Sequence, residues 1–131
     1  MTPDRERSNE SAHLPGSTLI DAYGNSGFRF GGMSHRGSIL CLPSGIWAWR
    51  PTQISELDRS DFDRVSAEAD SIEILLVGSG DAFYPLPPTI GDQLRCAGLR
   101  PDIMTTGAAI RTYNVLLGEG RSVAAALIAV D

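Results

Sequence analysis

The stretch from Thr105 to Arg121 constrains the fold more than any other part of this sequence. Threonine hydroxyls at its start can accept hydrogen bonds from the free N–H groups of a first helical turn, and the glycines near its end stand where a helix would stop. The polar face between them is narrow: Gly107, Arg111, Asn114 and Gly118. An apolar strand, 123–130, follows at once. The sequence therefore predicts a largely buried helix that leads directly into a strand.

Helical and strand patterns alternate from residue 60 to the end of the chain. A capping pattern at 60–63 opens a short helix to about Ala69, and the apolar run 72–77 is typical of a strand covered on both faces. Helix 89–97 and strand 101–104 come next, so that the order is α-β-α-β-α-β. This alternation predicts parallel strand pairs joined by right-handed crossovers.

The N-terminal half has a different pattern. Residues 1–16 are polar and without period, which predicts a disordered tail, and residues 17–131 are expected to form a single domain. Short strands that look antiparallel follow the tail, at 18–23, 38–42 and 45–49. We therefore predict a compact three-layer α/β fold with a mixed central sheet. In the last of these strands Trp47 and Trp49 share one face, which we expect to meet the core; a paired aromatic ligand site is the alternative.

Composition excludes several classes of protein. The formal net charge is −5, and the eleven basic residues are all Arg and are scattered, which argues against a nucleic-acid-binding surface. The chain lacks both the run of about 20 apolar residues that spans a membrane and an apolar secretory signal. Cys41 and Cys96 are far apart without a motif, so we expect two reduced, buried thiols. These features predict a cytoplasmic protein without membrane insertion.

The residues needed for catalysis or metal binding are sparse. The chain has two histidines, His13 and His35, and no Gly-x-Ser-x-Gly motif or paired His/Cys spacing. We therefore predict no catalytic residue, no metal site and no cofactor. Five carboxylates are expected to form a solvated helix face rather than an acid/base pair: Asp58, Asp61, Asp63, Glu68 and Asp70.

The sequence nevertheless contains one candidate ligand site, at the ends of the predicted parallel strands. Carboxyl ends of such strands meet at one sheet edge, where α/β folds build clefts. An anion or small-molecule cleft there would use seven residues: Gly78, Ser79, Gly80, Thr105, Thr106, Arg111 and Asn114. The glycine turn alone is a weak phosphate-loop signal. The other interpretation is that these polar groups satisfy backbone groups and carboxylates of the fold itself.

Several segments together resemble a known family, that of mitochondrial NADH dehydrogenase (complex I) assembly factor 3 and its bacterial and archaeal relatives. The likeness covers about residues 19–130, essentially the whole predicted domain. Its motifs are Val77–Asp81, Thr112–Leu116, Glu119–Arg121 and Ala125–Ile128, together with Asp21–Gly24, Gly27-Phe28 and Leu42-Pro43 with Trp49. Relatives often carry Cys where Ile110 stands here, so a thiol-based role is unsupported for this chain.

The resemblance implies a three-layer α/β domain and a soluble protein that binds other proteins while a respiratory enzyme matures at the membrane. We therefore expect a non-catalytic assembly factor with a protein partner, cytoplasmic or held peripherally at the inner membrane by that partner. Homo-oligomerisation stays open. The alternative from another class is a small-molecule or anion-binding domain, including an enzyme, that uses the cleft at Gly78–Gly80 and Thr105-Thr106.

Overall fold

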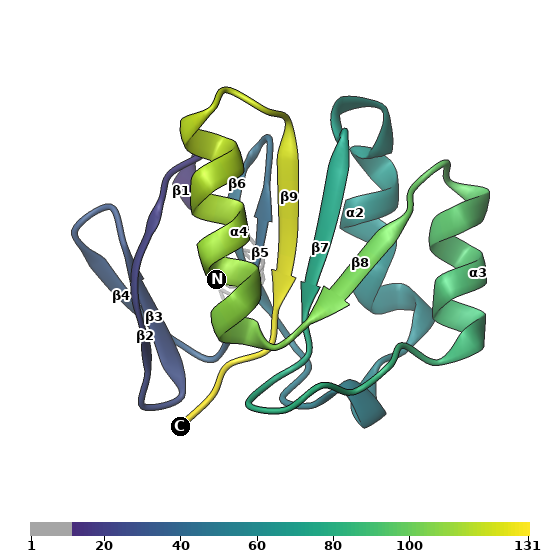
Figure 1. The fold of residues 1–131 in the computed structure, drawn as a ribbon, viewed down its shortest axis with the longest axis horizontal. Coiled ribbons are helices and arrows are strands. Elements are labelled where there is room, and N and C mark those ends of the chain that lie inside the picture. The colour runs from purple at the N-terminus through teal and green to yellow at the C-terminus, as the bar shows by residue number, and fades with distance from the viewer. Residues whose placement is uncertain (1–11) are drawn as a thin grey trace, which may run out of the picture.

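The structure, a computed structural model, describes residues 12–131. These residues form a six-stranded mixed sheet, a three-stranded antiparallel sheet and three α-helices, so the predicted α/β class is confirmed (Figure 1). The strand order in the large sheet is β1-β6-β5-β9-β7-β8. The bounds of these strands are β1 Ala12–Pro15, β5 Ser38–Leu42, β6 Gly45–Trp49, β7 Ile74–Gly78, β8 Pro101–Met104 and β9 Val123–Leu127.

Strand β9 lies inside the large sheet and joins its two halves. It pairs in parallel with β7 and antiparallel with β5, while β7 also pairs in parallel with β8. The predicted parallel pairings are therefore confirmed. All five residues of β9 are buried, and the middle three are alanines. Small side chains there let layers on both faces approach the sheet closely.

Helices cover both faces of the large sheet (Figure 1). Helix α4 (Thr106–Gly118) packs on β9 and β7, and its Tyr113 is fully buried in a cluster with residues of the three-stranded sheet. Helices α2 (Asp63–Ala67) and α3 (Pro88–Cys96) contribute to the core cluster on the opposite face. Leu116 and Leu117 of α4 are only half-buried, because they pack at the margin of their cluster rather than inside it.

The three-stranded sheet is a meander of β2 (Ile20–Gly24), β3 (Gly27–Phe30) and β4 (Met33–Arg36). Asn25 and Ser26 between its first two strands both have positive φ, 52° and 64°. A two-residue hairpin turn whose twist matches its strands requires this conformation, and asparagine tolerates it better than most residues.

The predicted N-terminal tail is wrong for residues 12–15. They form β1, which pairs with β6, and Leu14 packs at the edge of the core cluster beneath α4. A short strand with a single core leucine carries too little hydrophobic periodicity to stand out in a polar stretch. The rest of the predicted tail, residues 1–11, lies outside the described residues.

The helix predicted from Ser60 to Ala69 is shorter and is capped earlier. Asp58 is the N-cap of a 3₁₀ turn, Arg59–Phe62, which runs into α2. The Asp61 carboxylate accepts from the Asp58 N–H at 2.8 Å and forms an ion pair with Arg50 at 2.6 Å. Its side chain is largely buried, so Asp61 does not belong to the solvated face predicted for it.

Both tryptophans pack on the core, as predicted, but only one of the two cysteines is buried. Trp49 is buried, with its indole N–H donating to Asp61 O at 2.8 Å, whereas Trp47 is half-buried beneath the Arg64 guanidinium. Cys41 is buried, and this burial raises the pKa of its thiol, but Cys96 is exposed at the end of α3; both are free. Helix α3 lies on the surface and exposes one of its faces. The sequence around Cys96 did not show that this residue lies on that face.

Candidate functional site

The turn that follows β7 meets the start of α4. The Thr106 hydroxyl accepts from the Gly80 N–H at 3.0 Å and donates to the Ile128 carbonyl at 2.7 Å. The Thr106 N–H donates to Gly80 O at 2.9 Å. A Cβ on Gly78 would lie 2.9 Å from the Thr106 Cα, so only glycine allows this approach. Thr106 thus ties together the ends of β7, β9 and α4.

Ser79 connects the same turn to the next loop. Its N–H donates to Met104 O at 2.8 Å. Its hydroxyl lies 2.8 Å from Ala82 O and accepts from the Tyr84 N–H at 3.1 Å. The Thr105 hydroxyl is the N-cap of α4 and accepts from the Ala108 N–H at 3.4 Å, as its position predicted. The side-chain hydroxyls of this turn are therefore occupied by backbone groups.

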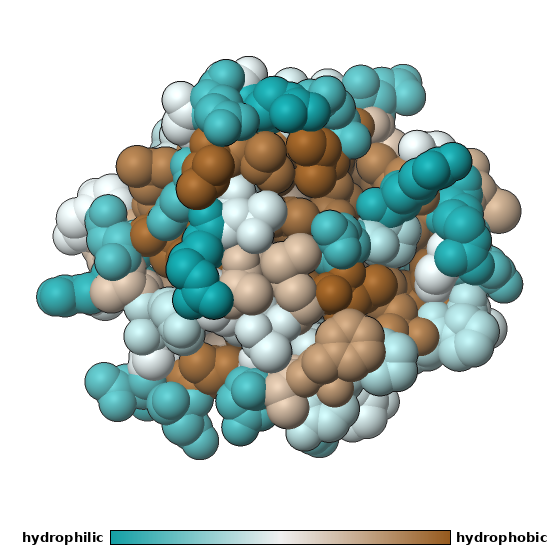
Figure 2. Space-filling view, in the orientation of Figure 1, coloured by the Kyte–Doolittle hydropathy of each residue, from teal (hydrophilic) through white to brown (hydrophobic). Residues whose placement is uncertain are grey.

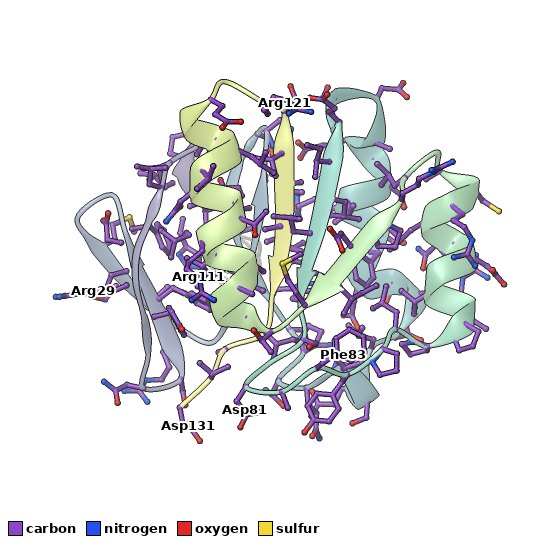
Figure 3. All side chains as sticks on the ribbon, viewed as in Figure 1. Arg29, Asp81, Phe83, Arg111, Arg121 and Asp131 are labelled. Carbon is purple, nitrogen blue, oxygen red and sulfur yellow. The ribbon has the colours of Figure 1, made fainter. Side chains whose placement is uncertain are left out.

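Two of the seven predicted site residues lie elsewhere. The Asn114 amide accepts from the Ile20 N–H and donates to the Ile20 carbonyl, each at 2.9 Å, so that it faces β2. Arg111 is exposed one turn earlier on α4, and Figure 3 shows it beside β2, well away from Asp81 of the turn. The structure thus brings together Gly78–Gly80 with Thr105 and Thr106, whereas Asn114 bonds to Ile20 and Arg111 reaches back along α4 only as far as Gly107, outside the groove described below.

A groove of about 920 Å³ opens on the outer side of the turn. It lies at the carboxyl ends of β7 and β9, among the loops at the lower edge of Figure 1. Of the predicted residues, Ser79 and Gly80 line it. Its apolar lining comes from three separate segments: Ile54, Tyr84–Pro88 and Ile128–Val130. The charged residues in its lining are Arg36, Asp81 and Asp131.

The loop between β7 and α3 contributes one wall of the groove and exposes two aromatic side chains. Phe83 is 59% exposed and Tyr84 50%. Figure 2 shows an aromatic side chain standing out at the lower right, where Figure 3 labels Phe83. The sequence pattern predicts only a loop for this segment. Its combination of two aromatics with three prolines in a chain of 7% aromatic residues was the available signal.

The two histidines lie together, one on β1 and one on β4. The rings of His13 in β1 and His35 in β4 have centroids 4.3 Å apart, and His13 Nε2 is buried with no hydrogen-bond partner among residues 12–131. Burial, and then the nearby His13, hold the pKa of His35 below its usual value. Within residues 12–131 there is no cluster of three or more His, Cys, Asp or Glu side chains that could hold a metal.

Among the helices of residues 12–131, none combines the length and the apolar character needed to cross a bilayer.

Comparison with known proteins confirms the resemblance inferred from the motifs. An uncharacterised protein of Rhodobacter capsulatus is 35% identical over 113 residues, which is 86% of each chain. NADH dehydrogenase [ubiquinone] 1 alpha subcomplex assembly factor 3 of Xenopus tropicalis is 31% identical over 110 residues, covering 84% of this chain and 60% of the factor. The chain therefore spans about three-fifths of the assembly factor's length.

Solved structures share the fold as well. A Bartonella henselae protein, described as an outer membrane protein, matches with a TM-score of 0.87 and 50% identity, covering 91% of this chain and all of that one. The family described as "Protein of unknown function (DUF498/DUF598)" matches residues 20–128, from the start of β2 to just beyond β9. This match covers most of the chain, and the chain therefore belongs to the DUF498/DUF598 family.

Proposed function

We propose that this chain is a protein-binding factor that acts, without catalysis of its own, in the assembly of respiratory complex I. The observation that carries the proposal is the match to assembly factor 3, which extends over 84% of the chain. The family model matches residues 20–128, which hold β2 to β9 and therefore α4, the three-stranded sheet and every strand of the six-stranded sheet except β1. A role that resides in this domain would be common to both proteins.

The surface supports a protein partner better than an anion at the glycine turn. The hydroxyls of Ser79, Thr105 and Thr106 already bond to backbone groups, so an anion there would have to displace them. Phe83 and Tyr84, by contrast, stand exposed on a loop with three prolines. Exposed aromatic side chains on a stiff segment are typical anchors of protein interfaces.

The net charge supports one route by which the protein would reach the membrane. With a net charge of −5, the protein gains no attraction from an anionic lipid surface. We infer that it reaches the inner membrane from the cytoplasm by binding a protein already located there. Whether it does so as a monomer or a homo-oligomer does not affect this route.

Deletion of the gene in a host that has complex I tests the proposal. We expect the amount of assembled complex I on native gels to fall, with unchanged messenger levels of its subunits, and to recover when the wild-type gene is returned. Levels that stay normal in the deletion strain under respiratory growth would contradict the assembly role.

A further inference from the structure

We propose that the groove at the carboxyl ends of β7 and β9 binds a segment of a partner protein that presents apolar side chains next to an arginine. The partner is a protein because of the proposed function; the groove and its preference for arginine stand on geometry and charge. The groove measures about 920 Å³, and its apolar lining consists of aliphatic, proline and tyrosine side chains. A cavity with this lining favours apolar side chains.

The base of the groove is built before any partner arrives. Thr106 and Ser79 hold the turn beneath it, and the N–H of Tyr84 donates to the Ser79 hydroxyl at 3.1 Å. Prolines at positions 85, 87 and 88 restrict the backbone that follows. Opposite this wall, Ser26 N–H donates to Val130 O at 2.8 Å, which fixes the segment after β9. A wall ordered in advance loses little conformational entropy on binding.

Phe83 favours a protein segment over a small molecule as the occupant. It is 59% exposed and is not among the residues that line the groove. A small molecule inside the groove would leave this ring in water. A partner chain that enters the groove and covers its rim would bury the ring, and aromatic side chains contribute much of the free energy at such interfaces.

Charge at the rim selects the kind of segment. The charged residues of the lining are two aspartates, Asp81 and Asp131, and one arginine, Arg36. Asp81 forms no hydrogen bond or ion pair with any residue in 12–131. A guanidinium can pair with this carboxylate at two points and can also stack on a neighbouring aromatic ring such as Tyr84. An acidic segment would instead meet a lining with an excess of negative charge.

A library of random twelve-residue peptides displayed on phage is the probe for this proposal, selected against the full chain. We expect the enriched peptides to contain an arginine beside at least two apolar residues. Titration of the best peptide into isotope-labelled protein should shift the NMR signals of Ile54, Tyr84 and Ile128, and also that of Phe83. Enrichment of acidic peptides, no enrichment at all, or signals shifted away from the groove would overturn the proposal.

Substitution of Asp81 tests the contribution of its charge to peptide binding separately from the fit of the peptide to the groove. Asp81→Asn should lower the affinity for the selected peptide by about fivefold, the usual effect of losing one partly exposed charge pair. Replacement of the peptide's arginine by glutamine should have no additional effect in this variant. Asp102→Asn is the control, since Asp102 is an exposed aspartate on β8 outside the groove lining. Equal losses in the two variants would contradict a specific pairing with Asp81.

Further experiments distinguish a small-molecule site from a peptide site, and the groove from the assembly role. Decanoate that shifts the groove signals in the absence of any peptide binding would identify a small-molecule site instead. If gene deletion lowers complex I but the Asp81→Asn, Phe83→Ser double variant restores it fully, the assembly role stands and the groove is not its surface. If deletion has no effect on complex I while peptides bind as expected, the groove stands and the assembly role fails.

Discussion

The two sides of the turn after β7 use their side chains in opposite ways. On the side toward α4, the Thr106 hydroxyl bonds to Gly80 and Ile128, and Gly78 lacks a Cβ because Thr106 lies too close. On the outer side, Asp81 has no partner among residues 12–131 and Phe83 is mostly exposed. The inner side holds three elements together, and the outer side is available to another molecule. The residues that look most reactive in the sequence belong to the inner side.

The sharpest test of this difference is Thr106→Val. Valine fills nearly the same space but leaves the Gly80 N–H and the Ile128 carbonyl buried without a partner. We expect the free energy of unfolding to fall by about 2–4 kcal/mol, as for two buried groups left unsatisfied. Urea denaturation measures the change. Thr112→Val is the matched control, because that hydroxyl contacts only the Met104 sulfur at 3.8 Å, and a similar loss there would remove the distinction.

Ser79→Ala tests the connection between the two sides. The serine hydroxyl accepts from the Tyr84 N–H and lies 2.8 Å from Ala82 O, so its removal frees the start of the outer loop. We expect a loss of about 1–2 kcal/mol in unfolding free energy. Hydrogen exchange at the Tyr84 amide should become faster while amides inside β7 stay protected. An unchanged Tyr84 amide would show that the prolines alone hold the loop.

The His13–His35 pair differs from the turn after β7, where the side-chain hydroxyls all have partners. In the pair, the buried His13 Nε2 has no hydrogen-bond partner among the described residues. Burial, followed by the adjacent His13, lowers the pKa of His35 in the folded state. The unfolded chain, with a pKa of about 6.5, therefore takes up the proton first as the pH falls. Stability should be full above pH 6.5 and should decline below it, until His35 is also protonated in the folded protein.

Chemical denaturation of wild type and His35→Gln between pH 7.5 and 5 measures this effect. Carboxylates titrate in both proteins, so the difference between the two curves isolates the histidine. We expect a shallower decline in the variant. Parallel curves would mean that the pair does not resist protonation.

The outer loop should matter for binding and hardly for folding. Phe83→Ser should change the free energy of unfolding by no more than about 0.5 kcal/mol, as is usual at exposed positions. The variant should nevertheless restore complex I poorly in the deletion strain. Val115→Ser is the matched control, because Val115 on α4 is 61% exposed and lies outside the groove lining. Full restoration by Phe83→Ser would place the contact surface elsewhere.

The smallest effect is expected from inorganic phosphate. An anion site that uses Gly78–Gly80, Thr105, Thr106, Arg111 and Asn114 remains a prediction of the sequence, and a thermal shift with phosphate tests it. Since Arg111 and Asn114 lie toward β2, we expect wild type and Arg111→Ala to respond equally, as to a non-specific salt effect. A rise in melting temperature that Arg111→Ala abolishes would restore the anion site.

Local sequence patterns were sufficient for most secondary structure. Strands 38–42, 45–49 and 101–104 have the predicted bounds. The first two are separated by Pro43 and Ser44, residues that favour a turn. The cap of α4 at Thr105 was also predicted. The errors fell where local signals compete, as at Asp58 and Ser60, each of which suits an N-cap.

The candidate site was much less accessible from sequence. A threonine beside a glycine turn looks the same whether its hydroxyl faces solvent or, like Thr106, a neighbouring strand end. The groove depends on segments around residues 37, 54, 84 and 129, which only tertiary packing brings together. Hydrophobic periodicity carries no information about such distant neighbours.

Asn114 has a consequence beyond its two hydrogen bonds. Its amide occupies both the N–H and the carbonyl of Ile20, as an adjoining strand would. An uncovered strand edge is a template on which another chain can pair, and such pairing leads to aggregation. Helix α4 therefore shields the beginning of β2 from intermolecular sheet growth with a single side chain. A chain that lost this amide would aggregate most readily during synthesis and refolding, because partly folded molecules are most concentrated then.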